Sequence, residues 1–157
     1  MESYSDWYNR TTKEISLNKD TLNKKTHKKY KVDLLLRLAK RVEDFSYICG
    51  ECQLFQPEIS KLTQDLNYLL QMPNPSKEAS KSYFKAIDNM VKHLQKKHKL
   101  VKEGHYLGIG IGIGMALSAG IGTVLGNPGI GPAAGIAIGV AIGIYLDKKA
   151  KQEGRVI

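Results

Sequence analysis

Two pairs of residues in this sequence are of the types that bind metal ions. Cys49 and Cys52 stand three positions apart and are the only cysteines among the 157 residues. His93 and His98 stand five positions apart, shortly before the C-terminal third of the chain. Thiolate sulfur and imidazole nitrogen are the usual ligands of structural zinc, and these local spacings fit a Cys2His2 site. The sequence between the pairs is much longer than in a short zinc finger, so the fold must bring the pairs together.

The elements that position these pairs are three predicted helices. Apolar residues recur at spacings of three and four over residues 30–55, over 58–71, and from residue 76 onward. Pro57 suits the first turn of the second helix, where a missing amide proton costs no hydrogen bond. Short connections favour an antiparallel bundle, in which the first and third helices run parallel. The cysteines near the end of the first helix and the histidines near the end of the third then lie at the same pole.

We therefore predict a zinc site that cross-links the first and third helices. Its ligands are Cys49, Cys52, His93 and His98. Other interpretations remain open, because free cysteines are often buried as small apolar side chains and the histidines can be polar positions on a lysine-rich helix. A redox pair lacks the strand and helix pattern of a thioredoxin-like fold, and a disulfide is disfavoured in a reducing compartment. The other histidines, at positions 27 and 105, are weaker candidates.

The C-terminal third has a different composition from the rest. Residues 106–146 contain no charged side chain and hold twelve of the fifteen glycines. Residues 106–125, as a helix, would rise about 30 Å, which matches the hydrocarbon core of a bilayer. A second apolar run covers 130–146, and an Asn-Pro-Gly turn signal separates the two runs. We predict a transmembrane helical hairpin over residues 105–146. A soluble helix pair is the alternative, and the Gly-Ile alternation over 108–114 also has the period of a strand.

Small residues recur every four positions along both predicted membrane helices. Small residues at this spacing let helix backbones approach closely, which is how helices associate in lipid. The predicted helix-packing residues are Gly110, Gly114, Ser118, Gly122, Gly126, Gly131, Gly135, Gly139 and Gly143.

The segment GIGIGIGMALSAGIGTVLGNPGIGPAAGIAIGVAIG, followed by DKKAKQEGR, resembles the glycine-zipper membrane segments of small bacterial proteins. The resemblance covers about the last fifty residues. It implies a packed membrane hairpin and self-association, and it brings no catalytic residue with it.

The charge distribution predicts the orientation of the hairpin. Residues 1–105 hold 20 basic and 13 acidic side chains, and residues 147–157 hold four basic and two acidic ones. Lysine and arginine favour the inner side of a membrane, so both termini are expected in the cytoplasm, at the inner membrane of a cell. The lysine cluster within 24–31 could also suggest nucleic acid. Next to a membrane segment, an anionic lipid surface is the better partner for these lysines, so nucleic acid is disfavoured.

The sequence thus predicts an all-α fold, a three-helix soluble bundle followed by a two-helix glycine-zipper transmembrane hairpin. Its expected parts are a flexible or partly helical basic arm (1–29), a cytoplasmic helical domain (30–104), the hairpin (105–146) and a basic tail (147–157). No Ser-His-Asp set, phosphate loop or paired carboxylates can be placed, so no enzyme activity is expected. The expected function is a membrane-anchored interaction or scaffold protein, which self-associates or binds another membrane protein. An oligomeric pore-forming or membrane-permeabilising effector is the alternative, although a pore favours more polar lining residues than Ser118 and Thr123.

Overall fold

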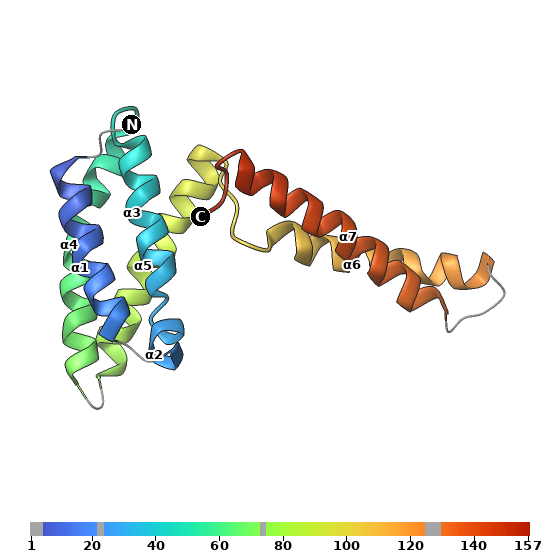
Figure 1. Cartoon of the computed structure of the whole chain (residues 1–157), viewed down its shortest axis with the longest axis horizontal. Coiled ribbons are helices and arrows are strands. Elements are labelled where there is room, and N and C mark those ends of the chain that lie inside the picture. The colour runs from blue at the N-terminus through green and yellow to red at the C-terminus, as the bar shows by residue number, and fades with distance from the viewer. Residues whose placement is uncertain (1–4, 22–23, 73–74, 125–129) are drawn as a thin grey trace. The chain divides into compact units, whose positions relative to one another are not determined.

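The computed structural model describes residues 5–21, 24–72, 75–124 and 130–157, and the regular elements within these ranges are helices (Figure 1). The prediction of an all-α chain is confirmed. The chain divides into two compact units, residues 1–98 and residues 99–157. The described helices are α1 (Asp6–Thr21), α2 (Lys24–Lys29), α3 (Val32–Ser46), α4 (Gly50–Gln71), α5 (Lys77–His98), α6 (His105–Val124) and α7 (Ile130–Gln152).

The first unit is a bundle of four long helices, α1, α3, α4 and α5, which lie side by side (Figure 1). Each helix turns an apolar stripe inward, because burying that stripe is what stabilises helices that are marginal alone. Fully buried side chains come from all four helices, and they include Ile15, Leu35, Leu38, Val42, Ile59, Leu66, Met90 and Leu94.

The N-terminal residues contribute one helix to the first unit. Residues 1–29 were expected to form a flexible or partly helical arm, and of these, residues 6–21 form α1, which packs on α3 and α4. Trp7, Thr11 and Ile15 share one helix face at spacings of four, with Thr11 and Ile15 buried. The indole Nε1 of Trp7 donates a hydrogen bond to Ser60 Oγ at 2.9 Å. Because a buried threonine interrupts the apolar stripe, the periodicity of this face is weak in the sequence.

The boundary between the first two predicted helices also differs. The sequence predicted one helix to residue 55 and a new one from Pro57, but α3 ends at Ser46 and α4 begins at Gly50 and continues through Pro57. Cys49 between them has an extended backbone, with φ −137° and ψ 108°. Pro57 therefore lies inside a helix, where it cannot donate the usual amide hydrogen bond.

In the second unit, glycines bring α6 and α7 into backbone contact. A Cβ atom added to Gly110 would overlap the carbonyl group of Gly139, and one added to Gly114 would overlap that of Gly135. A Cβ on Gly135 would also lie 3.0 Å from the Cβ of Ser118. Only a hydrogen in place of a side chain allows such an approach, so the two small-residue stripes face each other within one chain.

The other predicted packing positions are placed as follows. Gly131 and Gly143 are buried in α7, and a Cβ on Gly143 would lie 2.7 Å from the Cα atom of Leu107. Gly122 belongs to α6, and Gly126 lies outside the described residues. Association of the stripes between two chains stays a prediction.

One carboxylate closes the open end of this helix pair. Asp147 accepts the backbone amide of Tyr106 at Oδ1 (3.0 Å) and that of Leu107 at Oδ2 (2.9 Å). These amides belong to the first turn of α6, whose positive dipole end favours a negative charge. The first part of the predicted basic tail continues α7 as far as Gln152. Near the end of the tail, the carbonyl oxygen of Arg155 accepts a hydrogen bond from the Val101 amide at 2.8 Å.

Among the residues that the structure describes, none of the helices combines the length and the apolar content that crossing a membrane requires. The two spans predicted at 106–125 and 130–146 are therefore not supported by the described helices. In α6, glycine alternates with isoleucine over 108–114, and glycine adds little apolar surface. In α7 the apolar run stops at Asp147, and lysines follow in the last turns.

We expect Gly139→Leu to disrupt the second unit, because the new side chain would occupy the space of the Gly110 backbone. Overpacking of this kind costs about 1–3 kcal/mol of unfolding free energy. Hydrogen exchange of the α6 and α7 amides, followed by mass spectrometry, should speed up in this variant. Ile138→Leu is the matched control, because Ile138 is exposed and lies off the stripe. Equal exchange in the two variants would show that the glycine contact does not hold the pair together.

Candidate metal centre

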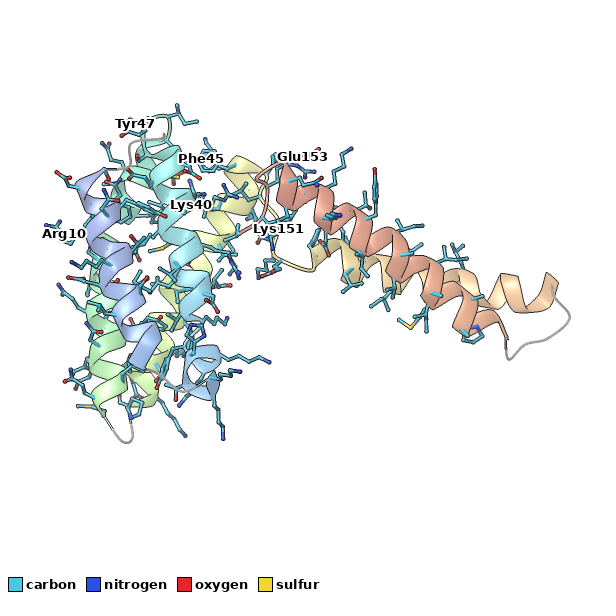
Figure 2. The ribbon with its side chains drawn as sticks, in the orientation of Figure 1. Arg10, Lys40, Phe45, Tyr47, Lys151 and Glu153 are labelled. Carbon is cyan, nitrogen blue, oxygen red and sulfur yellow. The ribbon has the colours of Figure 1, made fainter. Side chains whose placement is uncertain are left out.

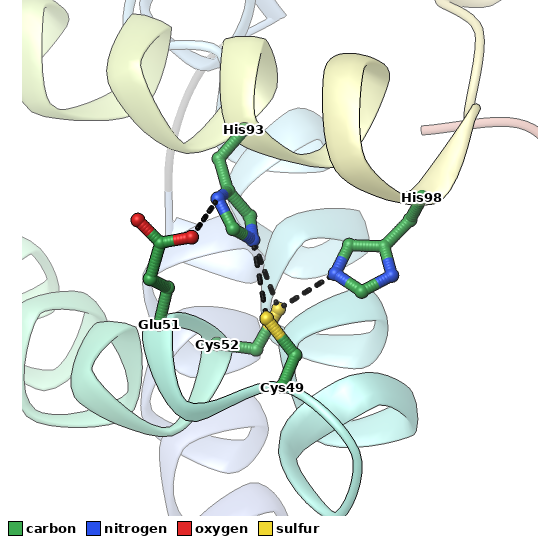
Figure 3. Close-up of polar contacts among 5 residues, drawn as sticks. All are labelled: Cys49, Glu51, Cys52, His93 and His98. Carbon is green, nitrogen blue, oxygen red and sulfur yellow. Dashed lines mark hydrogen bonds and ion pairs between the residues drawn. The ribbon is translucent and has the colours of Figure 1, made fainter.

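The four predicted ligands meet at one pole of the first unit (Figure 3). Cys49 occupies the N-cap position of α4, and Cys52 lies in the first turn of that helix. His93 and His98 lie in the last two turns of α5. At this pole α3 ends, α4 begins and α5 ends. The bundle topology therefore brings the two pairs together as expected. The cysteines, however, lie at the start of α4 and not near the end of the first predicted helix.

The distances among these side chains suit a shared ion. One ligand atom from each of the four residues lies within 4.8 Å of the others. His93 Nε2 lies 3.4 Å from Cys49 Sγ and 3.5 Å from Cys52 Sγ. His98 Nε2 lies 3.3 Å from Cys52 Sγ. Both cysteines are free and buried, so no disulfide takes up their sulfur atoms. The cluster can therefore bind a metal ion.

A fifth residue, Glu51, orients one of the histidines (Figure 3). Its Oε2 atom lies 3.1 Å from His93 Nδ1, on the opposite side of the ring from the two sulfur atoms. An acceptor at Nδ1 favours the tautomer whose Nε2 carries a lone pair, which is the form that binds a metal. The sequence analysis missed Glu51, although its position between the two cysteines was a signal for it.

Two phenylalanines fix the imidazole planes. Phe45, near the end of α3, stacks on His98 with ring centroids 4.0 Å apart and an interplanar angle of 20°. Phe55, on α4, meets His93 edge to face at 5.2 Å. The His93 side chain is only 10% exposed. Rings held in this way lose little further freedom when a metal binds, so the site is preorganised.

The protonation of the cluster favours neutral side chains. Burial raises the pKa of Cys52 to about 12, with smaller contributions from a hydrogen bond to Cys49 and from the charges of Cys49 and Glu51. Burial also lowers the pKa of His98, assisted by the charges of His93 and Lys97. A neutral His98 can act as a ligand at once, whereas Cys52 must lose its proton to bind. Metal binding near neutral pH should therefore release a proton.

The two remaining histidines lie apart from the cluster. His27 Nδ1 lies 3.4 Å from an Asp33 carboxylate oxygen. His105 begins α6 in the second unit and makes an edge-to-face contact with Tyr106 at 5.2 Å. Within the described ranges, one group of potential metal ligands comes together, and it consists of Cys49, Cys52, His93 and His98. No protein-family model, curated protein or solved structure matches this chain.

We expect Glu51→Ala to weaken metal binding by about 10- to 100-fold, because His93 loses the acceptor that holds its Nδ1. Glu51→Gln should lie between this variant and the native chain, since its amide oxygen still accepts the hydrogen bond without the charge. Competition with a chromophoric chelator measures the affinity for zinc. Glu78→Ala, an exposed glutamate at the start of α5, is the control. If the two alanine variants bind zinc with the same affinity, Glu51 does not contribute to metal binding.

Proposed function

We propose that this protein is a membrane-bound, non-enzymatic interaction protein, in which structural zinc holds a four-helix domain and an apolar hairpin attaches that domain to a lipid bilayer. The observation that carries the zinc part is the set of two sulfur and two imidazole ligand atoms within 4.8 Å of one another. Two sulfur and two nitrogen donors favour tetrahedral zinc over the oxygen-binding metals. With four protein ligands, the ion has no open position for a substrate, which argues for a structural role.

The surface chemistry of the hairpin supports the membrane part. The glycines of its two stripes, such as Gly110, Gly114 and Gly139, face inward, whereas large aliphatic side chains face outward on both helices. The exposed ones are Ile109, Ile113, Met115, Leu117, Ile136, Ile138, Ile142, Ile144 and Leu146. An apolar surface that surrounds a helix pair is unfavourable in water and is suited to lipid. The proposal concerns the pair as one body, which enters the bilayer together.

The charges at the ends of the hairpin fit this arrangement. The chain is lysine-rich just before α6 and again in the last turns of α7, and these two ends lie together in the second unit. Lysines favour the inner membrane surface, where anionic lipids attract them. The proposed location is therefore the inner membrane of a cell, with both termini in the cytoplasm. A second copy or another membrane protein would contact the same aliphatic surface, because the glycine stripes are already occupied within the chain.

The alternative, a pore-forming effector, has less support. A pore needs polar groups along one face of the hairpin, and Ser118 instead donates its hydroxyl to the Met115 carbonyl oxygen at 2.6 Å.

If zinc holds the first unit, the purified full chain should contain about one zinc per molecule, and a chelator should lower its melting temperature. Cys52→Ser should reproduce the effect of the chelator, and so should His98→Asn. His27→Asn is the matched control, because His27 lies outside the cluster. A protein without zinc whose melting is unchanged by chelator would contradict the proposal and leave the cysteines as buried thiols.

If the hairpin enters the bilayer and crosses it, cysteines introduced at Asn127 and Gln152 should react with an impermeant maleimide from opposite sides of sealed vesicles. The zinc-loaded parent protein supplies the background from the native cysteines. Equal labelling of both positions from one side would show that the hairpin does not cross. Recovery of the protein in the aqueous fraction, away from floating vesicles, would contradict membrane binding itself.

A further inference from the structure

An open cleft with a volume of about 620 Å³ lies beside the metal centre, on the other side of the turn that joins α3 to α4. This volume is within the usual range for small-molecule sites, which is about 300–1,000 Å³. The N-terminus of α1, the end of α3 and the first turns of α4 form its walls. The lining residues that matter here are Ser5, Trp7, Glu43, Tyr47, Gln53 and Gln56.

Glu43 is the unusual residue in this cleft, because it is a carboxylate that is only 3% exposed. Its Oε1 accepts the backbone amide of Ser5 at 2.8 Å, and its Oε2 accepts the amide of Gln56 at 3.0 Å. Both donors are uncharged. Among the described residues that line the cleft, none is a lysine, arginine or histidine. A buried carboxylate is costly without a positive partner. The cleft therefore presents a negative charge that the described residues of its walls do not neutralise.

Two aromatic side chains stand in the same cleft. Trp7 is fixed by the hydrogen bond from its Nε1 to Ser60 Oγ. Tyr47 lies at the end of α3, at the pole of the bundle, and is 81% exposed (Figure 2). Aromatic faces attract organic cations, and they cover the apolar carbons of such a group at the same time. A solvent-exposed tyrosine costs the folded protein little if it is removed, which makes it a useful probe.

We propose that this cleft binds an organic cation, with an ammonium or guanidinium group on the Glu43 carboxylate and its alkyl part between Trp7 and Tyr47. A divalent metal ion is a poorer fit, because calcium and magnesium need several oxygen ligands and the described residues of the cleft include one carboxylate, that of Glu43. Uncharged groups at Gln53 and Gln56 can accept the remaining N–H donors. The cation is either a free polyamine or the side chain of a lysine or arginine in a partner protein.

The test uses Trp7 as its reporter, since it is the only tryptophan in the chain and it lines the cleft. Zinc-loaded full-length protein is titrated with n-butylammonium chloride and, in parallel, with n-butanol, which has the same carbon chain without the charge. We expect a saturable change in fluorescence with the ammonium ion and binding at least about tenfold weaker for the alcohol. Spermidine and N-acetyl-lysine methylamide then distinguish a free polyamine from a protein side chain.

Three variants decide the role of the residues. Glu43→Gln keeps the shape and an acceptor for Ser5, and should raise the dissociation constant of n-butylammonium by about tenfold or more. Tyr47→Ala should raise it by about threefold. Tyr68→Ala is the control, because Tyr68 is also an exposed tyrosine but lies on α4, away from the residues that line the cleft. Zinc content and melting temperature show that each variant is folded.

The inference would be overturned by equal binding of n-butanol and n-butylammonium, by unchanged affinity in Glu43→Gln, or by the absence of a saturable signal. If Glu43→Gln does not fold, Tyr47→Ala carries the test on its own. Glu43 is not one of the candidate metal ligands and the cleft lies wholly in the first unit, so a loss of cation binding in Glu43→Gln reports on the cleft rather than on zinc ligation or membrane binding.

Discussion

The first unit depends on the joining of two chain segments that are far apart in sequence. The turn between α3 and α4 carries the cysteines, and the end of α5 carries the histidines, about forty residues later. Their side chains meet around the His93 ring, whose Nε2 faces both sulfur atoms and whose Nδ1 faces Glu51. Ordering so many polar groups in one buried place costs conformational entropy and hydration. A bound metal ion would offset both costs, because it satisfies all four donors at once.

The helices of the two units pack in opposite ways. In the first unit, large side chains such as Leu38, Leu66 and Met90 fill the space between helices. In the second, the stripe glycines of α6 and α7 bring the two backbones into contact, and large aliphatic side chains lie on the outside. Burial of apolar area therefore stabilises the first unit in water. The second unit gains mainly from close backbone contact and from the Asp147 carboxylate at the start of α6, and its outer surface exposes large aliphatic side chains.

Much of the candidate metal site could be predicted from the sequence, because both the types of the four side chains and the bundle topology can be inferred from it. Two cysteines and two histidines restrict the chemistry, and an antiparallel bundle restricts which helix ends can meet. Less could be predicted where a local signal was misleading. Pro57 indicated a helix start, but α4 already begins at Gly50. The extended backbone of Cys49 ends the preceding turn and caps this helix. The sequence indicated α1 only as part of a flexible or partly helical arm, because Thr11 is buried where an apolar residue would be expected.

The glycine stripes show a different limit of sequence reasoning. Their four-residue spacing predicts a helix face that touches another helix, but spacing alone does not say whether the partner lies in the same chain or in a second one. Only the register of α6 against α7 places Gly110 on Gly139 and Gly114 on Gly135. That register leaves the aliphatic face, rather than the glycine face, for any external partner.

The turn over residues 47–49 connects the proposed zinc site to the proposed cation cleft. Cys49 is a candidate ligand on one side of this turn and also lines the cleft, while Tyr47, two residues earlier, forms an aromatic wall of the cleft. Because the backbone is shared, an ion that fixes Cys49 also restricts where Tyr47 can lie. If metal binding raises the affinity of the cleft for a cation by some factor, a bound cation must raise the affinity of the zinc site for its metal by the same factor. The short segment between two helices can thus couple two sites without movement of the bundle core, whose side chains are fully buried.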